Sequence, residues 1–139
     1  MGDFWYANVV VSARQGPLRL FILDWELART GLPGFEIGLF CGSMDFLIRN
    51  NPVASEPGSL IVRKFIDAYG RVSNRGASLV QDILSHWGIH HIFWAPRVVL
   101  FSDEKELVHD FVREGVKLMV CSRDTEFQVQ SPVNVLLLK

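Results

Sequence analysis

Two polar residues near the start of the sequence have the types and the spacing needed to act on a hydroxyl group. Asp3 and Asn8 lie five residues apart in the segment GDFWYAN. A carboxylate can orient an attacking hydroxyl and accept its proton, and an amide oxygen at the far end of the same loop can bind a phosphate-bound Mg²⁺. This spacing is common, so the alternative for Asp3 is a flexible acidic residue near the start of the chain.

A further carboxylate, that of Asp24, closes the apolar run in FILDWE. At the end of a strand, a fixed carboxylate could hold the Mg²⁺ that bridges two phosphates. A hairpin between Asn8 and Asp24 would bring these two metal ligands together. The alternative for Asp24 is a turn-forming residue at the strand end.

The segment that separates these residues has the pattern of a β-hairpin. Residues 8–12 (NVVVS) and 18–25 (LRLFILDW) are apolar and rich in β-branched or aromatic side chains, and the turn residues of RQGP lie between them. We therefore predict two short strands, followed by a loop at residues 30–34.

From residue 35 onward the apolar residues follow a helical period. The pattern predicts a first helix between Phe35 and Leu47, although it contains Gly38 and Gly42. A polar loop is predicted at 50–58, followed by a helix at 60–69 that ends at Gly70 and a helix at 79–94 that stops at Pro96. The fourth predicted helix has a core face from Leu107 to Met119 and is capped by Ser102. The apolar tail at 131–139 is predicted to be either a strand or an irregular end. The fold class is α+β and mostly helical: a hairpin followed by four or so helices in a single domain, 1–139.

Taken together, these segments resemble a known family. The stretches GDFWYANVVVS and LFILDWELARTGLPGFEIG are similar to the catalytic core of the aminoglycoside phosphotransferase and choline kinase-like superfamily, which has a protein-kinase-like fold. That family carries a His-Gly-Asp-x-x-x-x-Asn loop, then a strand ending in Asp-Phe/Trp-Glu, then a helix start containing Asp. The segment SHWGIHHIFWAPR also resembles a C-terminal helix of fungal and bacterial members.

The resemblance implies a role for each matching residue. Asp3 would be the catalytic base, Asn8 and Asp24 would bind Mg²⁺ and the nucleotide phosphates, and Glu26 would be a lesser partner near the second metal ion. The implied reaction transfers the γ-phosphoryl group of ATP to a hydroxyl of a small molecule. The sequence departs from the family pattern at Met1, which replaces the His, and at Glu36, which replaces the Asp of the helix start.

The resemblance also implies that only the C-terminal lobe is present, because a Gly-rich phosphate loop and a strand Lys would precede Asp3. We therefore expect little kinase activity from the 139-residue polypeptide alone. The alternative function is a non-catalytic interaction module or degenerate pseudokinase that forms a homodimer through an exposed apolar face. The acceptor cannot be identified from the sequence.

Composition favours a cytoplasmic protein that binds neither nucleic acid nor membrane. The chain has 14 basic and 15 acidic residues, a net charge of −1 and no basic stripe. We expect no signal peptide, and the sequence contains no apolar stretch of about 18 residues. Hydrophobic residues make up 49% of the chain, which predicts an open apolar face. Cys41 and Cys121 are predicted to be buried free thiols.

Histidines and tryptophans in the third predicted helix have two interpretations each. His86 and His90 are one turn apart and could share a zinc ion, but packed histidines are favoured because no third ligand is evident. Trp87 and Trp94 could form part of an aromatic cage for an amine, but core packing is favoured.

Overall fold

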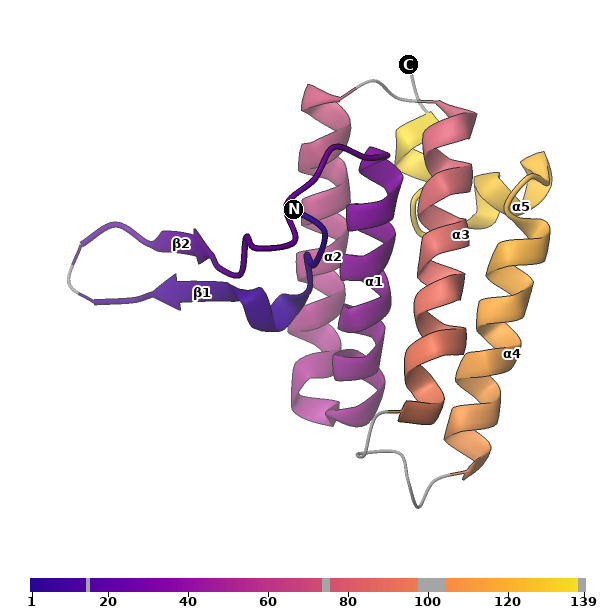
Figure 1. Cartoon of the computed structure of the whole chain (residues 1–139), viewed down its shortest axis with the longest axis horizontal. Helices are drawn as coiled ribbons and strands as arrows, with labels where there is room; N and C mark the ends of the chain where they lie inside the picture. The colour runs from indigo at the N-terminus through magenta and orange to yellow at the C-terminus, as the bar shows by residue number, and fades with distance from the viewer. Residues whose placement is uncertain (15, 74–75, 98–104, 138–139) are drawn as a thin grey trace.

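The computed structural model describes residues 1–14, 16–73, 76–97 and 105–137, and confirms a mostly helical α+β fold (Figure 1). Within these residues, one antiparallel hairpin precedes the helices. The elements are the strands β1 (Val9–Ser12) and β2 (Arg19–Ile22), the helices α1 (Pro33–Asn50), α2 (Pro52–Val72), α3 (Ala77–Trp94), α4 (Lys105–Cys121) and α5 (Thr125–Gln130), and 3₁₀ turns at Tyr6–Asn8, Ala95–Arg97 and Asn134–Leu137.

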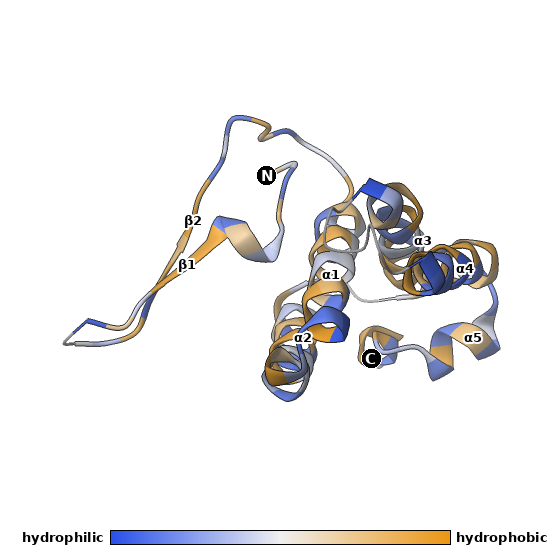
Figure 2. Ribbon diagram, turned by 90° about the horizontal axis from the view of Figure 1, so that it is seen from below, coloured by the Kyte–Doolittle hydropathy of each residue, from blue (hydrophilic) through white to orange (hydrophobic). Residues whose placement is uncertain are grey.

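The hairpin extends away from the helices, so its apolar side chains remain uncovered (Figure 2). Its register pairs Val9 with Ile22 and Ser12 with Arg19, and all four residues of β2 are exposed. Leu20, for example, retains 63% of its accessible surface. The predicted apolar face is therefore present on the hairpin. Self-association through it stays a prediction.

The core lies between α1, α2 and α3 and is closed by the C-terminal segment. Ile83 and Leu84 of α3 are fully buried against Phe40 of α1 and Ile66 of α2. A second cluster forms where Phe111 of α4 packs against α1, with ring centroids of Phe46 and Phe111 4.6 Å apart. The predicted core face of the fourth helix is confirmed at Phe111 and Leu118, whereas Met119 is 38% exposed.

Glycines in α1 do not break the helix, because they allow α3 to pass at very short range. A Cβ atom added at Gly38 would lie 2.6 Å from the carbonyl oxygen of Ile83, and one at Gly42 would lie 2.7 Å from the ring of His90. The helical period of α1 is thus compatible with both residues, since close packing compensates for their low helix propensity.

The prediction of a polar loop at residues 50–58 was wrong, because α2 begins at Pro52. Asn51 caps this helix, its side-chain oxygen accepting a hydrogen bond from the N–H of Val53 at 3.1 Å. Proline is favoured in the first turn of a helix. Pro57 removes the N–H that would bond to the carbonyl of Val53, but Val53 is 86% exposed and water can satisfy that carbonyl.

The end of α2 and the C-terminal tail also differ from the predictions. Gly70 is buried inside α2, which continues to Val72. The tail is not a strand: Ser131 donates a side-chain hydrogen bond to the carbonyl of Gln128 at 2.7 Å, and a 3₁₀ turn follows. Leu136 is fully buried there, so a local turn places its side chain in the core. The predicted cap at Ser102 lies outside the described residues.

Within the described part of the chain, no helix is both long and apolar enough to cross a membrane.

The close contact between α1 and α3 predicts a stability defect for Gly38→Ala. A methyl group there overlaps backbone atoms of α3, so the free energy of unfolding should fall by about 1–3 kcal/mol. Chemical denaturation measures this change. Gly31→Ala is the matched control, because a Cβ at Gly31 meets no atom within 4 Å, and its stability should be unchanged. Equal stability of the two variants would contradict this account.

Candidate active site

The loop that carries Asp3 is fixed to the helices on both sides of this residue. The ring of Phe4 stacks on Phe40 of α1 at a centroid distance of 5.0 Å and also contacts Phe65 of α2 at 5.7 Å. Asn8 donates hydrogen bonds to the backbone oxygen of Asp3 at 3.0 Å and to its carboxylate at 3.3 Å. Asp3 is therefore held in place, in contrast to the flexible acid considered above.

Glu36 provides the second anchor of this loop. Its carboxylate accepts hydrogen bonds from the backbone N–H groups of Gly2 and, at 3.2 Å, of Phe4, the two neighbours of Asp3. A carboxylate that accepts two N–H groups forms charge-assisted hydrogen bonds, which are stronger than neutral ones. Glu36 belongs to the first turn of α1, so the helix directly sets the position of the loop.

The hairpin places the backbone of Asn8 beside Leu23, the residue that precedes Asp24. The N–H of Leu23 donates to the carbonyl of Asn8 at 2.9 Å, which extends the pairing of the strands to the residue next to Asp24. Asp24 has a φ of 64°, in the left-handed region that Asp tolerates better than most residues. It lies two residues beyond the end of β2 rather than within the strand. A strained backbone at an acidic residue is frequent at functional sites.

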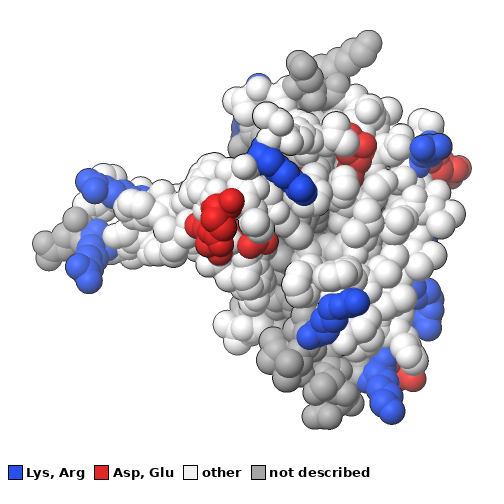
Figure 3. All heavy atoms as spheres, viewed as in Figure 1, with Lys and Arg blue, Asp and Glu red and all other residues white. Residues whose placement is uncertain are grey.

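The carboxyl group of Glu26 is influenced by two neighbouring acids, Asp24 and Asp3. A hydrogen bond with Asp24 raises the pKa of Glu26 above its ordinary value, and the negative charges of Asp24 and Asp3 act in the same direction. Figure 3 shows acidic side chains gathered where the hairpin meets the helices. Oxygen ligands with an excess of negative charge suit a divalent cation.

Among the described residues, no three His, Cys, Asp or Glu side chains converge closely enough to form a metal site by themselves. Mg²⁺ does not require such a cage, because it is commonly bound by one or two carboxylates together with substrate phosphates. The donor set of Asn8, Asp24 and Glu26 therefore fits Mg²⁺ in its chemistry.

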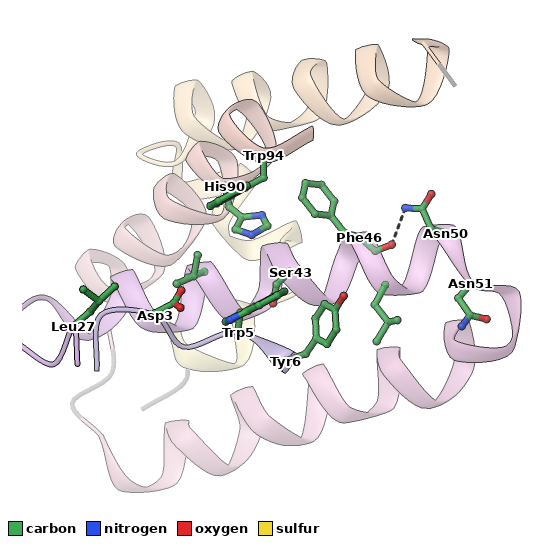
Figure 4. A pocket seen from close by; sticks show the side chains of 12 residues that line it. Asp3, Trp5, Tyr6, Leu27, Ser43, Phe46, Asn50, Asn51, His90 and Trp94 are labelled. Carbon is green, nitrogen blue, oxygen red and sulfur yellow. Dashed lines mark hydrogen bonds between the residues drawn. The ribbon is translucent and has the colours of Figure 1, made fainter. Parts of the chain in front are cut away.

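A cavity of about 760 Å³ lies beside Asp3, between the N-terminal loop and helices α1 and α3 (Figure 4). Asp3 occupies one end, Asn50 and Asn51 occupy the other, and aromatic side chains line the space between them. The lining residues are Asp3, Trp5, Tyr6, Leu27, Leu39, Ser43, Phe46, Leu47, Asn50, Asn51, His90 and Trp94. The cavity can therefore hold a planar apolar molecule with one end at the Asp3 carboxylate.

His90 is the buried histidine of the cavity wall. Only 7% of its surface is exposed, and its ring packs against Phe46 at a centroid distance of 4.9 Å. Burial lowers the pKa of His90 to about 3, and the neighbouring His91 acts in the same direction. The imidazole is therefore neutral at physiological pH.

The structure decides between the two interpretations that the sequence left for His86, Trp87 and Trp94. His86 packs edge-on against Phe35, which together with buried His90 supports the packed-histidine interpretation. Trp87 is 5% exposed and its indole N–H donates to Asp45 at 2.9 Å, so it belongs to the core as predicted. Core packing was wrong for Trp94, which is 44% exposed and lines the cavity.

The two predicted free cysteines differ in burial. Cys41 is fully buried in the core, which raises the pKa of its thiol well above the ordinary value, while Cys121 is half-buried.

Comparison with known proteins gives a weak but extended similarity. No family model matches the sequence, and no solved structure matches it significantly. The 4-hydroxytryptamine kinase of Psilocybe cubensis is 25% identical over 120 residues, which cover 84% of this chain and 32% of that protein. The 4-hydroxytryptamine kinase of Psilocybe cyanescens is 22% identical over the same shares.

The chain thus spans about a third of the length of the curated relatives it matches. The similarity supports a small-molecule-kinase-like region.

The anchoring role of Glu36 predicts a local change in Glu36→Ala. Without the carboxylate, the N–H of Phe4 loses its acceptor, and its hydrogen exchange should become roughly ten- to a hundredfold faster. Exchange measured by NMR tests this. Glu56→Ala removes an exposed carboxylate of α2 and should leave the exchange of Phe4 unchanged.

The low pKa of His90 predicts acid destabilisation. Above pH 6.5 this residue is neutral in both the folded and the unfolded chain. Between pH 6.5 and about 3 the unfolded chain binds a proton that the folded chain does not, so stability falls as the pH falls. Urea unfolding at pH 7.5 and 5 should show a loss on the order of 2 kcal/mol from this residue.

The variant His90→Phe should lose this part of the pH dependence. The exposed His109 of α4 offers the matched control His109→Phe, which should retain it. An identical pH dependence in the wild type and His90→Phe would show that His90 is not the group responsible.

Proposed function

We propose that this chain supplies the catalytic and acceptor-binding part of a kinase that phosphorylates a hydroxyl group on an aromatic small molecule, with ATP and Mg²⁺ as cofactors. The observation that carries the proposal is the position of Asp3. Its carboxylate lies at one end of a cavity with aromatic walls, where the hydroxyl of a bound planar molecule would meet it.

In the proposed reaction, Asp3 orients the hydroxyl and accepts its proton as the oxygen attacks the γ-phosphorus of ATP. The bond between this phosphorus and the β,γ-bridging oxygen breaks, and ADP leaves. Phosphoryl transfer depends mainly on positioning and charge stabilisation. The anchors of the Asp3 loop, which are Phe4, Asn8 and Glu36, support this role because they fix the carboxylate before the acceptor arrives.

Asn8 and Asp24 would hold Mg²⁺, with Glu26 as a lesser partner. When bound, Mg²⁺ would neutralise charge on the phosphates. Asp24 and Asp3 lie close enough to raise the pKa of Glu26, and this gathering of acidic oxygens supports the assignment because such ligands suit a divalent cation.

Two observations support an aromatic acceptor. Trp5, Tyr6, Phe46 and Trp94 line the cavity. The two relatives are named for kinases of 4-hydroxytryptamine, a hydroxylated aromatic molecule. We further propose membership of the aminoglycoside phosphotransferase and choline kinase-like superfamily, on the motifs around Asp3 and Asp24.

Residues 1–139 contain no Gly-x-Gly-x-x-Gly segment that could cover the nucleotide phosphates. We therefore propose that the 139-residue polypeptide alone transfers phosphate slowly. The assay accordingly uses the protein expressed from its complete native transcript, and the 139-residue polypeptide beside it.

Asp3→Asn tests the catalytic role. Asparagine can still accept the hydrogen bond of Asn8 but cannot take the proton, so kcat on a hydroxylated aromatic acceptor should fall by a factor of about 10²–10⁴. A coupled assay of ADP release measures the rate. Asp67→Asn is the control, because Asp67 pairs with Arg71 on the exposed side of α2. Equal rates for Asp3→Asn and the wild type would refute the proposed role of Asp3.

A further inference from the structure

His90 is a buried polar side chain in the cavity wall that the proposed reaction does not use. It comes from α3, on the side of the cavity opposite the loop that carries Asp3 (Figure 4). Its ring is held between Phe46 and Trp94, at centroid distances of 4.9 Å and 6.5 Å. The position of the imidazole is therefore fixed by packing, as a specificity-determining group requires.

The Nδ1 atom of His90 is buried and has no hydrogen-bond partner among the described residues. It lies against the backbone of α1, where a Cβ on Gly42 would approach it to 2.8 Å. A buried N–H without a partner is rarer than a buried acceptor without one. Nδ1 is therefore assigned as the unprotonated nitrogen of the neutral ring, and the N–H is assigned to Nε2, the other ring nitrogen of this cavity-lining residue.

Ser43, Asn50 and Asn51 of the wall each form a local hydrogen bond with the backbone. The hydroxyl of Ser43 donates to the carbonyl of Phe40 at 2.8 Å, and the amide of Asn50 donates to the carbonyl of Phe46 at 2.8 Å. Asn51 accepts from Val53 as the cap of α2. Asp3 is the charged residue among those that line the cavity in the described part of the chain. A bound molecule thus meets the Asp3 carboxylate at one end of the cavity and the imidazole of His90 in the aromatic wall.

We propose that the acceptor is a planar hydroxylated aromatic molecule with a second polar atom, a hydrogen-bond acceptor in or on the ring, and that the Nε2–H of His90 binds this atom. This inference rests on the proposed function for the role of the hydroxyl at Asp3. It adds a specificity-determining residue, because a site built to form a hydrogen bond discriminates against a molecule that lacks the matching atom.

The experiment compares probes of the same shape on the protein at its native length, without nucleotide. 1-Naphthol has no ring heteroatom, 5-hydroxyisoquinoline has an acceptor nitrogen, and 4-hydroxyindole has an N–H donor. Calorimetry at pH 8 should show 5-hydroxyisoquinoline binding about tenfold more tightly than 1-naphthol, as expected for one hydrogen bond. 4-Hydroxyindole should not share this advantage.

In His90→Phe the advantage of 5-hydroxyisoquinoline should disappear while 1-naphthol still binds. His90→Leu, which removes the ring, provides the same comparison should the larger Phe disturb packing against Gly42. His86→Phe is the matched control from the same helix. His86 does not line the cavity, so the advantage should persist in this variant.

Equal affinities of the wild type for 1-naphthol and 5-hydroxyisoquinoline would overturn the proposal, and so would an advantage that survives in both His90 variants. A preference for 4-hydroxyindole would overturn the assignment of His90 as a donor. Because binding is measured without ATP, these results are independent of phosphoryl transfer. Asp3→Asn should slow transfer by the factor of about 10²–10⁴ given above and keep the ring preference.

Discussion

The candidate site depends on the attachment of one short loop to helix α1. The backbone N–H groups of the two residues that flank Asp3 donate to the carboxylate of Glu36. The ring of Phe4 also packs against the core, where it stacks on Phe40. A loop without such contacts would lose conformational entropy each time a ligand ordered it. In this protein the loop loses its conformational entropy during folding, before any ligand binds. The same helix also provides Ser43, Phe46 and Asn50 to the cavity, so the acid and the cavity share one rigid support.

The hairpin, in contrast to the Asp3 loop, is only weakly attached to the helices. It joins Asn8 to Asp24 through backbone pairing, yet its side chains make little contact with the helices, and Val11, Leu20 and Phe21 are exposed. An isolated two-stranded ribbon is marginally stable in water. The proposed metal-binding side of the candidate site is therefore less rigidly supported than the proposed acceptor side, although both meet near Asp3.

Much of the site could be predicted from sequence, because its residues are close along the chain or joined by a hairpin. The spacing of Asp3 and Asn8, and the hairpin pattern between Asn8 and Asp24, can be recognised directly in the sequence. The cavity could not be predicted, since it is formed by the loop, α1 and α3, and nothing local pairs Trp5 with Trp94 or His90. Trp94 was assigned to the core because helical periodicity does not distinguish a core from a cavity wall. The loop predicted at residues 50–58 failed for a different reason: two prolines and a glycine dominate its composition, whereas Asn51 and Pro52 are favourable at a helix start.

The glycine contacts between α1 and α3 have a consequence for how this protein can diverge. The separation of these two helices is set by backbone atoms of α3 that face Gly38 and by the His90 side chain that faces Gly42, so substitutions that widen the cavity by moving the helices apart would disrupt the core. Trp5 and Tyr6 stand on the loop instead, where exchange of one ring for another leaves the contacts of Gly38 and Gly42 between α1 and α3 unchanged. Duplicated genes that adapt to new acceptors would therefore accumulate changes at these two loop positions, and retain the glycines, long before the framework itself altered.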